Sequence, residues 1–244
     1  MKTIIRILFV VCVAILFVAC TPSETPPTSE IYNLVDVTGS HQSQPVHLTA
    51  DKLMRLSGLD SEPKSGVTYT QSLITEVHLN QELPIALVPA SPSKYNKYKR
   101  RAKVKRFVAQ VMQAIEDVQQ ADYDRESSTI FLNVNNTITK VANNNADQQL
   151  VIIQSDMLNN SREFSAYNRQ DMKKLVQSPN YLAELLEQYA PITATSLSLQ
   201  KMKVIIVFQP TDTQTDYAFR LISQRFKDYL LSKGMQSVEV VANL

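Results

Sequence analysis

Short apolar runs alternate along the chain with longer stretches in which apolar residues recur every three or four positions. An uninterrupted apolar run is typical of a strand buried on both faces, whereas the recurring spacing is typical of a helix with one buried face. The runs predict strands at residues 31–36, 67–79, 83–89, 150–153, 204–208 and 237–242.

The clearest predicted helix covers residues 104–118, where apolar side chains form one stripe. Its stripe consists of Val104, Phe107, Val108, Val111, Met112, Ile115 and Val118. A shorter pattern predicts a helix near 49–57. Another helix is expected to bury Ile130, Val134, Ile138 and Val141.

The ends of the remaining helices are predicted from capping residues. Ser127 or Ser128 is suited to cap the helix that contains Ile130. Ser178-Pro179 indicates a helix start, because proline is tolerated at the first helical position. Its inward residues are expected to be Leu182, Leu185, Leu186 and Tyr189. A final helix is expected to be capped by Thr215 or Asp216 and stopped by Gly234.

Buried strands interleaved with amphipathic helices predict an α/β fold: a doubly wound, mostly parallel sheet covered by helices on both sides. No second linker interrupts the pattern, so residues 31–244 are expected to form one domain. Four glycines in 244 residues leave no glycine-rich dinucleotide loop, and no H-E-x-x-H, G-x-S-x-G or Walker-type motif occurs.

The first 19 residues have the pattern of a secretory signal peptide, with Lys2 and Arg6 ahead of an apolar run at 7–19. The segment Phe17-Val18-Ala19-Cys20 resembles a bacterial lipobox. The resemblance implies cleavage before Cys20 and attachment of acyl chains to that cysteine. An ordinary signal peptide followed by a chance cysteine is the alternative.

Residues 20–30 would then be the lipidated cysteine and a proline- and threonine-rich tether. The expected location is the bacterial cell envelope, with the protein anchored to a membrane. Thr21, where aspartate would retain a lipoprotein at the inner membrane, favours the outer membrane by resemblance to enterobacterial sorting. Cys12 and Cys20 are the only cysteines, so the body is expected to fold without disulfides.

Oxygen-bearing side chains occur just after predicted strands and before a predicted helix. Because ligands bind beyond the carboxyl ends of parallel strands, these residues are expected to converge. Hard divalent cations such as Mg²⁺ prefer oxygen ligands. The expected ligands are Asp36, Thr38, Ser40, Thr129 and Asp156. The alternatives are that Asp36, Thr38 and Asp156 only stabilise turns and that Thr129 only caps a helix.

Asp36-Val37-Thr38-Gly39-Ser40 resembles the D-x-[ST]-x-S motif of von Willebrand factor type A (vWA) domains. The resemblance implies a six-stranded sheet, mostly parallel and flanked by helices. It also implies a metal-ion-dependent adhesion site that binds Mg²⁺, or Mn²⁺ or Ca²⁺, with Thr129 and Asp156 as further ligands. Two positions depart from the family pattern: Ser128 precedes Thr129 and Met157 follows Asp156, where glycines are usual.

The function expected from this resemblance is that of a binding module without enzymatic activity. Its metal would accept an acidic side chain from a protein of the envelope. A structural lipoprotein with a degenerate site is one alternative. A haloacid-dehalogenase-type phosphohydrolase is another, but that family needs a second aspartate where this chain has Thr38.

Eight basic residues lie within positions 94–106, with Tyr95 and Tyr98 among them, and no acidic residue occurs there. They are Lys94, Lys97, Lys99, Arg100, Arg101, Lys103, Lys105 and Arg106. The run could contact anionic lipid or an acidic partner, or it could simply be a solvated helix face. The formal charge of the whole chain is only +2, and the expected envelope location argues against nucleic acid as a partner.

Overall fold

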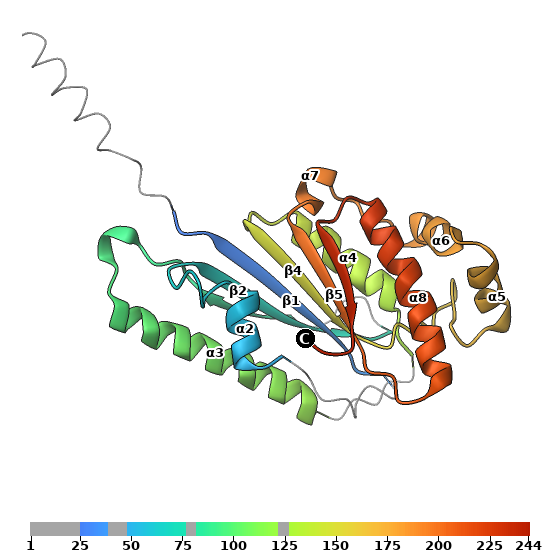
Figure 1. Cartoon of the computed structure of the whole chain (residues 1–244), viewed down its shortest axis with the longest axis horizontal. Coiled ribbons are helices and arrows are strands. Elements are labelled where there is room, and N and C mark those ends of the chain that lie inside the picture. The colour runs from blue at the N-terminus through green and yellow to red at the C-terminus, as the bar shows by residue number, and fades with distance from the viewer. Residues whose placement is uncertain (1–24, 39–47, 77–81, 122–126) are drawn as a thin grey trace, which may run out of the picture.

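The computed structural model describes residues 25–38, 48–76, 82–121 and 127–244. Its centre is one six-stranded sheet in the order β3-β2-β1-β4-β5-β6 (Figure 1). All neighbouring strands are parallel except β3, which is antiparallel to β2. The strands are β1 (Thr28–Asp36), β2 (Gly66–Ile74), β3 (Leu83–Leu87), β4 (Gln148–Gln154), β5 (Met202–Val207) and β6 (Ser237–Val241).

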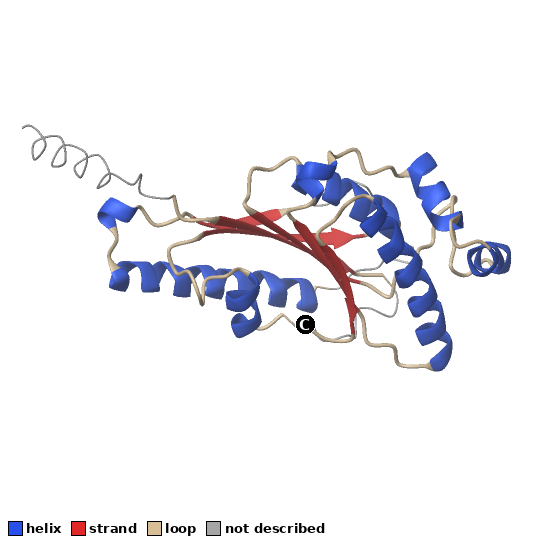
Figure 2. Ribbon diagram, turned by 45° about the horizontal axis from the view of Figure 1, so that its top comes forward, coloured by secondary structure: helices blue, strands red, loops and turns tan. Residues whose placement is uncertain are grey.

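Helices cover both faces of the sheet (Figure 2). The helices α2 (Ala50–Leu56) and α3 (Lys97–Gln120) lie on one face, and α4 (Ile130–Ala142) and α8 (Thr213–Ser232) lie on the other. The remaining described helices are η2 (Pro92–Lys94), α5 (Arg169–Gln177), α6 (Tyr181–Tyr189) and α7 (Ser196–Leu199). The predicted α/β class, with one mostly parallel sheet flanked by helices, is confirmed.

The two faces of the sheet carry separate apolar layers because successive side chains of a strand point in opposite directions. In β1, Ile31 packs with Leu53 and Phe107 on the α2–α3 side, whereas Leu34 packs with Val134 on the other side. These layers are built from residues after Thr28, so we expect residues 21–244 to fold without the apolar leader.

Some predicted boundaries are wrong for local reasons. The α4 N-cap is Thr129 rather than Ser127 or Ser128, and the α8 N-cap is Asp212, which accepts hydrogen bonds from two backbone amides. Pro179 precedes the N-cap of α6 and is not its first helical residue. Tyr189 was expected inside, yet it is 53% exposed.

Two further differences between the predicted and the observed elements concern the start of β1 and the helix α5. The strand β1 begins at Thr28, inside the segment assigned to the tether. Helix α5 was not predicted, because it buries only Leu175. Among the described residues, no helix combines the length and the apolar character that a membrane span requires.

Candidate functional site

The carboxyl ends of β1 and β4 lie side by side at the centre of the sheet. Val35 is paired with Gln154, so Asp36 is the next residue on one strand and Ser155 and Asp156 follow on the other. The chain order reverses between these two strands, since β2 and β3 extend to one side and β5 and β6 to the other. Such a reversal opens a crevice at the strand ends, where doubly wound sheets bind ligands.

Asp36 is buried, and both of its carboxylate oxygens accept hydrogen bonds. Oδ1 accepts the backbone N–H of Thr38 at 3.1 Å and its hydroxyl at 2.6 Å, and Oδ2 accepts the hydroxyl of Ser155 at 2.8 Å. The side chain is only 2% exposed. The Thr38 contacts form the turn that was the alternative explanation for this pair. A turn and a metal site are compatible, because a carboxylate oxygen has more than one lone pair.

Ser155 and Asp156 organise the loop after β4. The hydroxyl of Ser155 accepts the backbone N–H of Met157 at 2.9 Å, and Asp156 Oδ1 accepts the N–H of Leu158 at 2.8 Å. Met157 has a φ of 60°, and its side chain is fully buried. A left-handed backbone favours glycine, which is the residue that the vWA pattern has at this position. Methionine is therefore strained at this position of the loop.

Thr129 lies at the start of α4, where its hydroxyl already has two partners. The hydroxyl donates to the Thr75 carbonyl at 3.2 Å and accepts from the side-chain amide of Asn133 at 2.9 Å. It makes no capping bond to α4. Instead, Asn159 Oδ1, from the loop after β4, accepts the N–H of Phe131 at 3.3 Å. A structural role for Thr129 is thus present whether or not it also binds a metal.

The charges of the two aspartates affect the pKa of Tyr167. Partial desolvation raises the pKa of its hydroxyl, and the carboxylates of Asp156 and Asp36 raise this pKa further. The ring is nevertheless 68% exposed. Both carboxylates therefore act electrostatically on one largely exposed phenol.

A cavity of about 310 Å³ adjoins the site at the start of α4. Thr129 and Asn159 contribute polar groups to its lining, and Phe131 and Phe164 contribute apolar rings. Arg162, Glu163 and Tyr189 bring polar groups to the lining. A partner side chain with an apolar body and a polar tip would fit such a lining.

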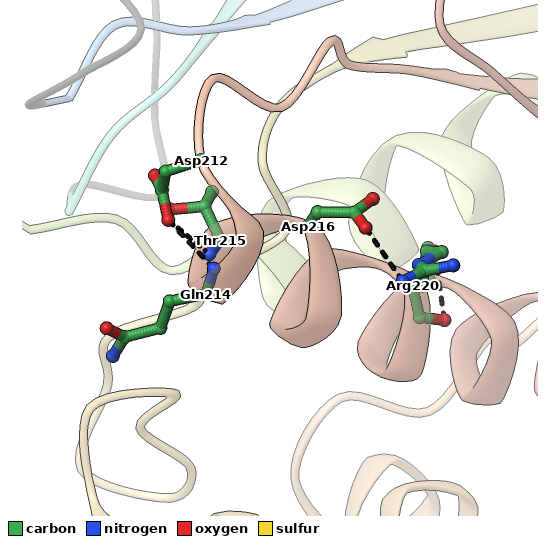
Figure 3. A network of polar contacts seen from close by, with 6 residues as sticks. Asp212, Gln214, Thr215, Asp216 and Arg220 are labelled. Atoms are coloured by element: carbon green, nitrogen blue, oxygen red, sulfur yellow. Dashed lines mark hydrogen bonds and ion pairs between the residues drawn. The ribbon is translucent and has the colours of Figure 1, made fainter.

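The N-terminus of α8 is a second polar cluster at the carboxyl end of the sheet (Figure 3). Asp212 accepts the backbone N–H groups of Gln214 and Thr215, each at 2.9 Å, and the hydroxyl of Thr215 at 2.6 Å. These bonds, led by the Thr215 hydroxyl, lower the pKa of Asp212. Asp216 pairs with Arg220 one turn along at 2.7 Å. The cluster is explained as an exposed helix cap.

The structure brings Asp36, Thr38 and Asp156 to one end of the sheet, and it places Thr129 at the start of the adjoining α4. Ser40 and Cys20 lie outside the described residues. Within the described part of the chain, no group of three or more His, Cys, Asp or Glu side chains could hold a metal ion. The donor set is thus two buried carboxylates with neutral hydroxyls. Such oxygen ligands fit Mg²⁺, which binds few carboxylates and keeps several waters.

Sequence reasoning missed three residues of the site: Ser155, Asn159 and Tyr167. Ser155 precedes a predicted ligand and closely follows a predicted strand, which is a usable signal. Asn159 and Tyr167 lie in an irregular loop and have no periodicity that would single them out.

Comparison with known proteins yields a likeness of structure alone. No family model matches the chain, and no curated protein matches its sequence. An aspartate-to-alanine mutant of the PilB minor pilin from Streptococcus sanguinis aligns over 92% of this chain with 11% identity and a TM-score of 0.46. The human COPII-coat protein Sec24c aligns over 92% with 14% identity and a TM-score of 0.43. This chain spans 59% of the pilin chain and 30% of Sec24c.

Proposed function

We propose that this protein is a lipid-anchored binding module of the bacterial cell envelope, with a vWA-like domain that recognises a protein partner through a bound divalent cation. Cys20 carries the lipid, and the outer membrane is the favoured location. Asp36, Thr38, Ser40 and Asp156 hold Mg²⁺, or Mn²⁺ or Ca²⁺, and Thr129 contributes through its hydroxyl or through a bridging water. The protein has no enzymatic activity of its own.

The observation that carries this proposal is the pair of buried carboxylates at the switch point of the sheet. Asp36 ends β1 and Asp156 follows the adjacent strand β4 by two residues, and both are less than 10% exposed. Burying a carboxylate is costly unless it is paired, and no basic side chain pairs with Asp36 among the described hydrogen bonds and salt bridges. A divalent cation would compensate the charge of Asp36.

The ligand chemistry also supports recognition of an acidic partner. Asp36 and Asp156 are the only charged ligands proposed, and the other three, Thr38, Ser40 and Thr129, are neutral. A cation held mainly by neutral oxygens and water retains affinity for one more carboxylate. The cavity beside Thr129 would then receive a neighbouring side chain of the same partner.

Calorimetric titration of residues 21–244 with Mg²⁺, Mn²⁺ and Ca²⁺ tests the metal site. We expect the parent protein to bind at least one ion, and Asp36→Asn and Asp156→Asn to bind it at least about tenfold more weakly. Asparagine retains an oxygen for the Thr38 contacts, so the variants are expected to keep the fold, which thermal melting checks.

Asp212→Asn is the matched control, because Asp212 lies at the same end of the sheet and asparagine caps helices as well as aspartate does. Its heats should equal those of the parent. Equal heats for Asp36→Asn and the parent would refute the site. An absence of heat with all three ions would favour the structural lipoprotein with a degenerate site. Turnover of phosphate esters that depended on Asp36 would favour the phosphohydrolase.

A further inference from the structure

The basic residues lie at the end of the sheet opposite the aspartates. Because β3 is antiparallel to β2, it carries the chain back to the amino end of the sheet, where Leu87 pairs with Val67. The helix α3 starts after η2 at the same end of the molecule as the beginning of β1 (Figures 1 and 2). Two backbone hydrogen bonds hold the loops at this end together. The Gly66 N–H at the start of β2 donates to the Pro27 carbonyl just before β1 at 2.9 Å, and the Ala90 N–H after β3 donates to the Lys64 carbonyl before β2 at 2.9 Å.

One member of the run, Arg100, is not available to any partner. It is only 4% exposed, and its guanidinium donates to the carbonyls of Pro63 and Val88, each at 2.7 Å, and to that of Ser65. Arg100 therefore fastens the start of α3 to the segments around β2 and β3. Counting it as a possible surface contact was wrong, because its helical phase places it on the face that packs against the sheet.

The other seven basic side chains are exposed and are named here the basic surface. They are Lys94, Lys97, Lys99, Arg101, Lys103, Lys105 and Arg106. None of them forms a salt bridge with a residue of the described segments. Tyr98 stands among them with 86% of its surface exposed.

This distribution of charge is unfavourable for α3 in isolation. The first turn of the helix has no acidic residue and its last turn has no basic one, which is the reverse of what the helix dipole favours. Neighbouring cations on one helix also repel one another. A partner of opposite charge removes this repulsion.

We propose that the basic surface docks on the anionic phospholipid headgroups of the membrane in which the protein is anchored. The proposal rests on the lipid anchor at Cys20 that belongs to the proposed function. Thr28 is eight positions after Cys20 in the sequence, and such a segment spans at most about 29 Å when fully extended. Since β1 begins at the same end of the sheet as α3, the anchor keeps this end near the membrane.

Charge and side-chain type both fit a headgroup layer. Lysine and arginine contribute about a fivefold gain in binding for each side chain that reaches an anionic surface. An exposed tyrosine such as Tyr98 suits the interface between headgroups and water. Docking through this end leaves Asp36 and Asp156 on the far side, because nine-residue β1 spans about 26 Å between the two ends.

The test is binding of residues 21–244 to phosphatidylcholine vesicles with and without phosphatidylglycerol, measured by sedimentation at low and high salt. We expect binding only to the anionic vesicles and only at low salt. Two triple variants divide the basic surface by its helical spacing. They are Lys97→Gln/Arg101→Gln/Lys105→Gln and Lys99→Gln/Lys103→Gln/Arg106→Gln. At least one should bind about tenfold to a hundredfold more weakly.

A matched control removes three exposed cations from α5, which follows the opposite end of the sheet: Arg169→Gln/Lys173→Gln/Lys174→Gln. It should bind as the parent does, and all variants should melt like the parent. Equal binding of both basic-surface variants and the parent, or equal binding to neutral vesicles, would overturn the proposal. Tighter binding to soluble polyglutamate than to anionic vesicles would overturn it in favour of an acidic protein partner.

The anchor is tested separately, so that the two failures are distinguishable. The full chain is compared with its Cys20→Ser variant by fractionation of envelopes in high salt, which weakens headgroup contacts but not acyl chains. Loss of membrane association only in Cys20→Ser supports the anchor, whatever the vesicles show. Equal association of both chains would overturn the anchor and, with it, the orientation proposed here.

Discussion

The two ends of the sheet place charge in opposite ways. At the amino end, seven cations of the basic surface are exposed, and one cation, Arg100, is buried among backbone carbonyls. At the carboxyl end, single acidic residues far apart in sequence are buried together: Asp36 and Asp156. The cations that are close together in sequence are thus mostly exposed, whereas the two aspartates that are isolated in sequence are buried.

The difference teaches that the number of charges in a segment says less about function than their phase in a helix or strand does. Arg100 is four residues before Val104 and seven before Phe107, so all three share the buried side of α3. Arg101, its neighbour, lies on the exposed side.

The largest effect is expected at the amino end, from Arg100→Met. Methionine keeps much of the apolar stem but leaves three buried carbonyls without their donor, so we expect a loss of about 3 kcal/mol or more in the free energy of unfolding. The same change at Arg101 should alter stability by no more than about 0.5 kcal/mol. Urea unfolding of both variants measures the difference. Similar midpoints for the two would show that the contacts of Arg100 do not stabilise the fold.

At the carboxyl end, the left-handed backbone of Met157 predicts an unusual order of stability. Truncation to alanine or glycine removes a buried side chain and should cost about 2–4 kcal/mol. Glycine tolerates positive φ and alanine does not, so Met157→Gly should exceed Met157→Ala in stability by about 1 kcal/mol. Thermal or urea unfolding of the two variants measures the order.

Met202 is the control for this order, because it is equally buried but lies in the regular strand β5. There alanine should be the more stable replacement, since glycine weakens a strand interior. If alanine were also the better residue at position 157, the loop after β4 would not require its left-handed conformation.

A smaller effect concerns Glu30 of β1, at the amino end of the sheet. Burial raises the pKa of its carboxyl, against the lowering effect of a hydrogen bond from Asn144 and the charge of Lys140. Its Oε2 and the Oε1 of Gln149, the opposite residue on β4, are both buried acceptors without a partner among the described residues. A proton on Glu30 would supply a donor between them.

A raised folded-state pKa means that the protonated form stabilises the fold. This contribution is fully present below the ordinary carboxyl pKa and is lost as the pH rises through the raised one. Glu30→Gln should therefore match the parent at about pH 4 and exceed it in stability at about pH 8. A parallel pH profile for Glu30→Gln and the parent would contradict the prediction.

Most of the secondary structure could be predicted, because it follows from local patterns. The stripe from Val104 to Val118 and the runs at 150–153 and 204–208 correspond to α3, β4 and β5. The stop at Gly234 is also confirmed, since its φ of 94° is a conformation that glycine adopts at a helix end. Helix α5 was missed because its single buried residue leaves no apolar stripe.

The candidate site could be predicted in part. Residues that end apolar strands are visible in the sequence, which is how Asp36 and Asp156 were found. The residues that hold them are not visible, because those contacts join distant positions. Ser155 donates a hydrogen bond to Asp36, 119 positions away in the sequence. Asn159, in the loop after β4, accepts the N–H of Phe131 in the first turn of α4. No local pattern encodes such a pair.

The amino-acid sequence by itself determined the alternation of strands and helices, the buried face of each helix and the class of the fold. Periods of two and about 3.6 residues are set by backbone geometry within a segment. Only the tertiary structure decided that β1 and β4 are neighbours, that the Arg100 guanidinium donates to carbonyls of segments far from it in the chain, and that the basic and acidic groups lie at opposite ends. Those outcomes depend on strand order and on the antiparallel return of β3, which arise when segments far apart in the chain pack together.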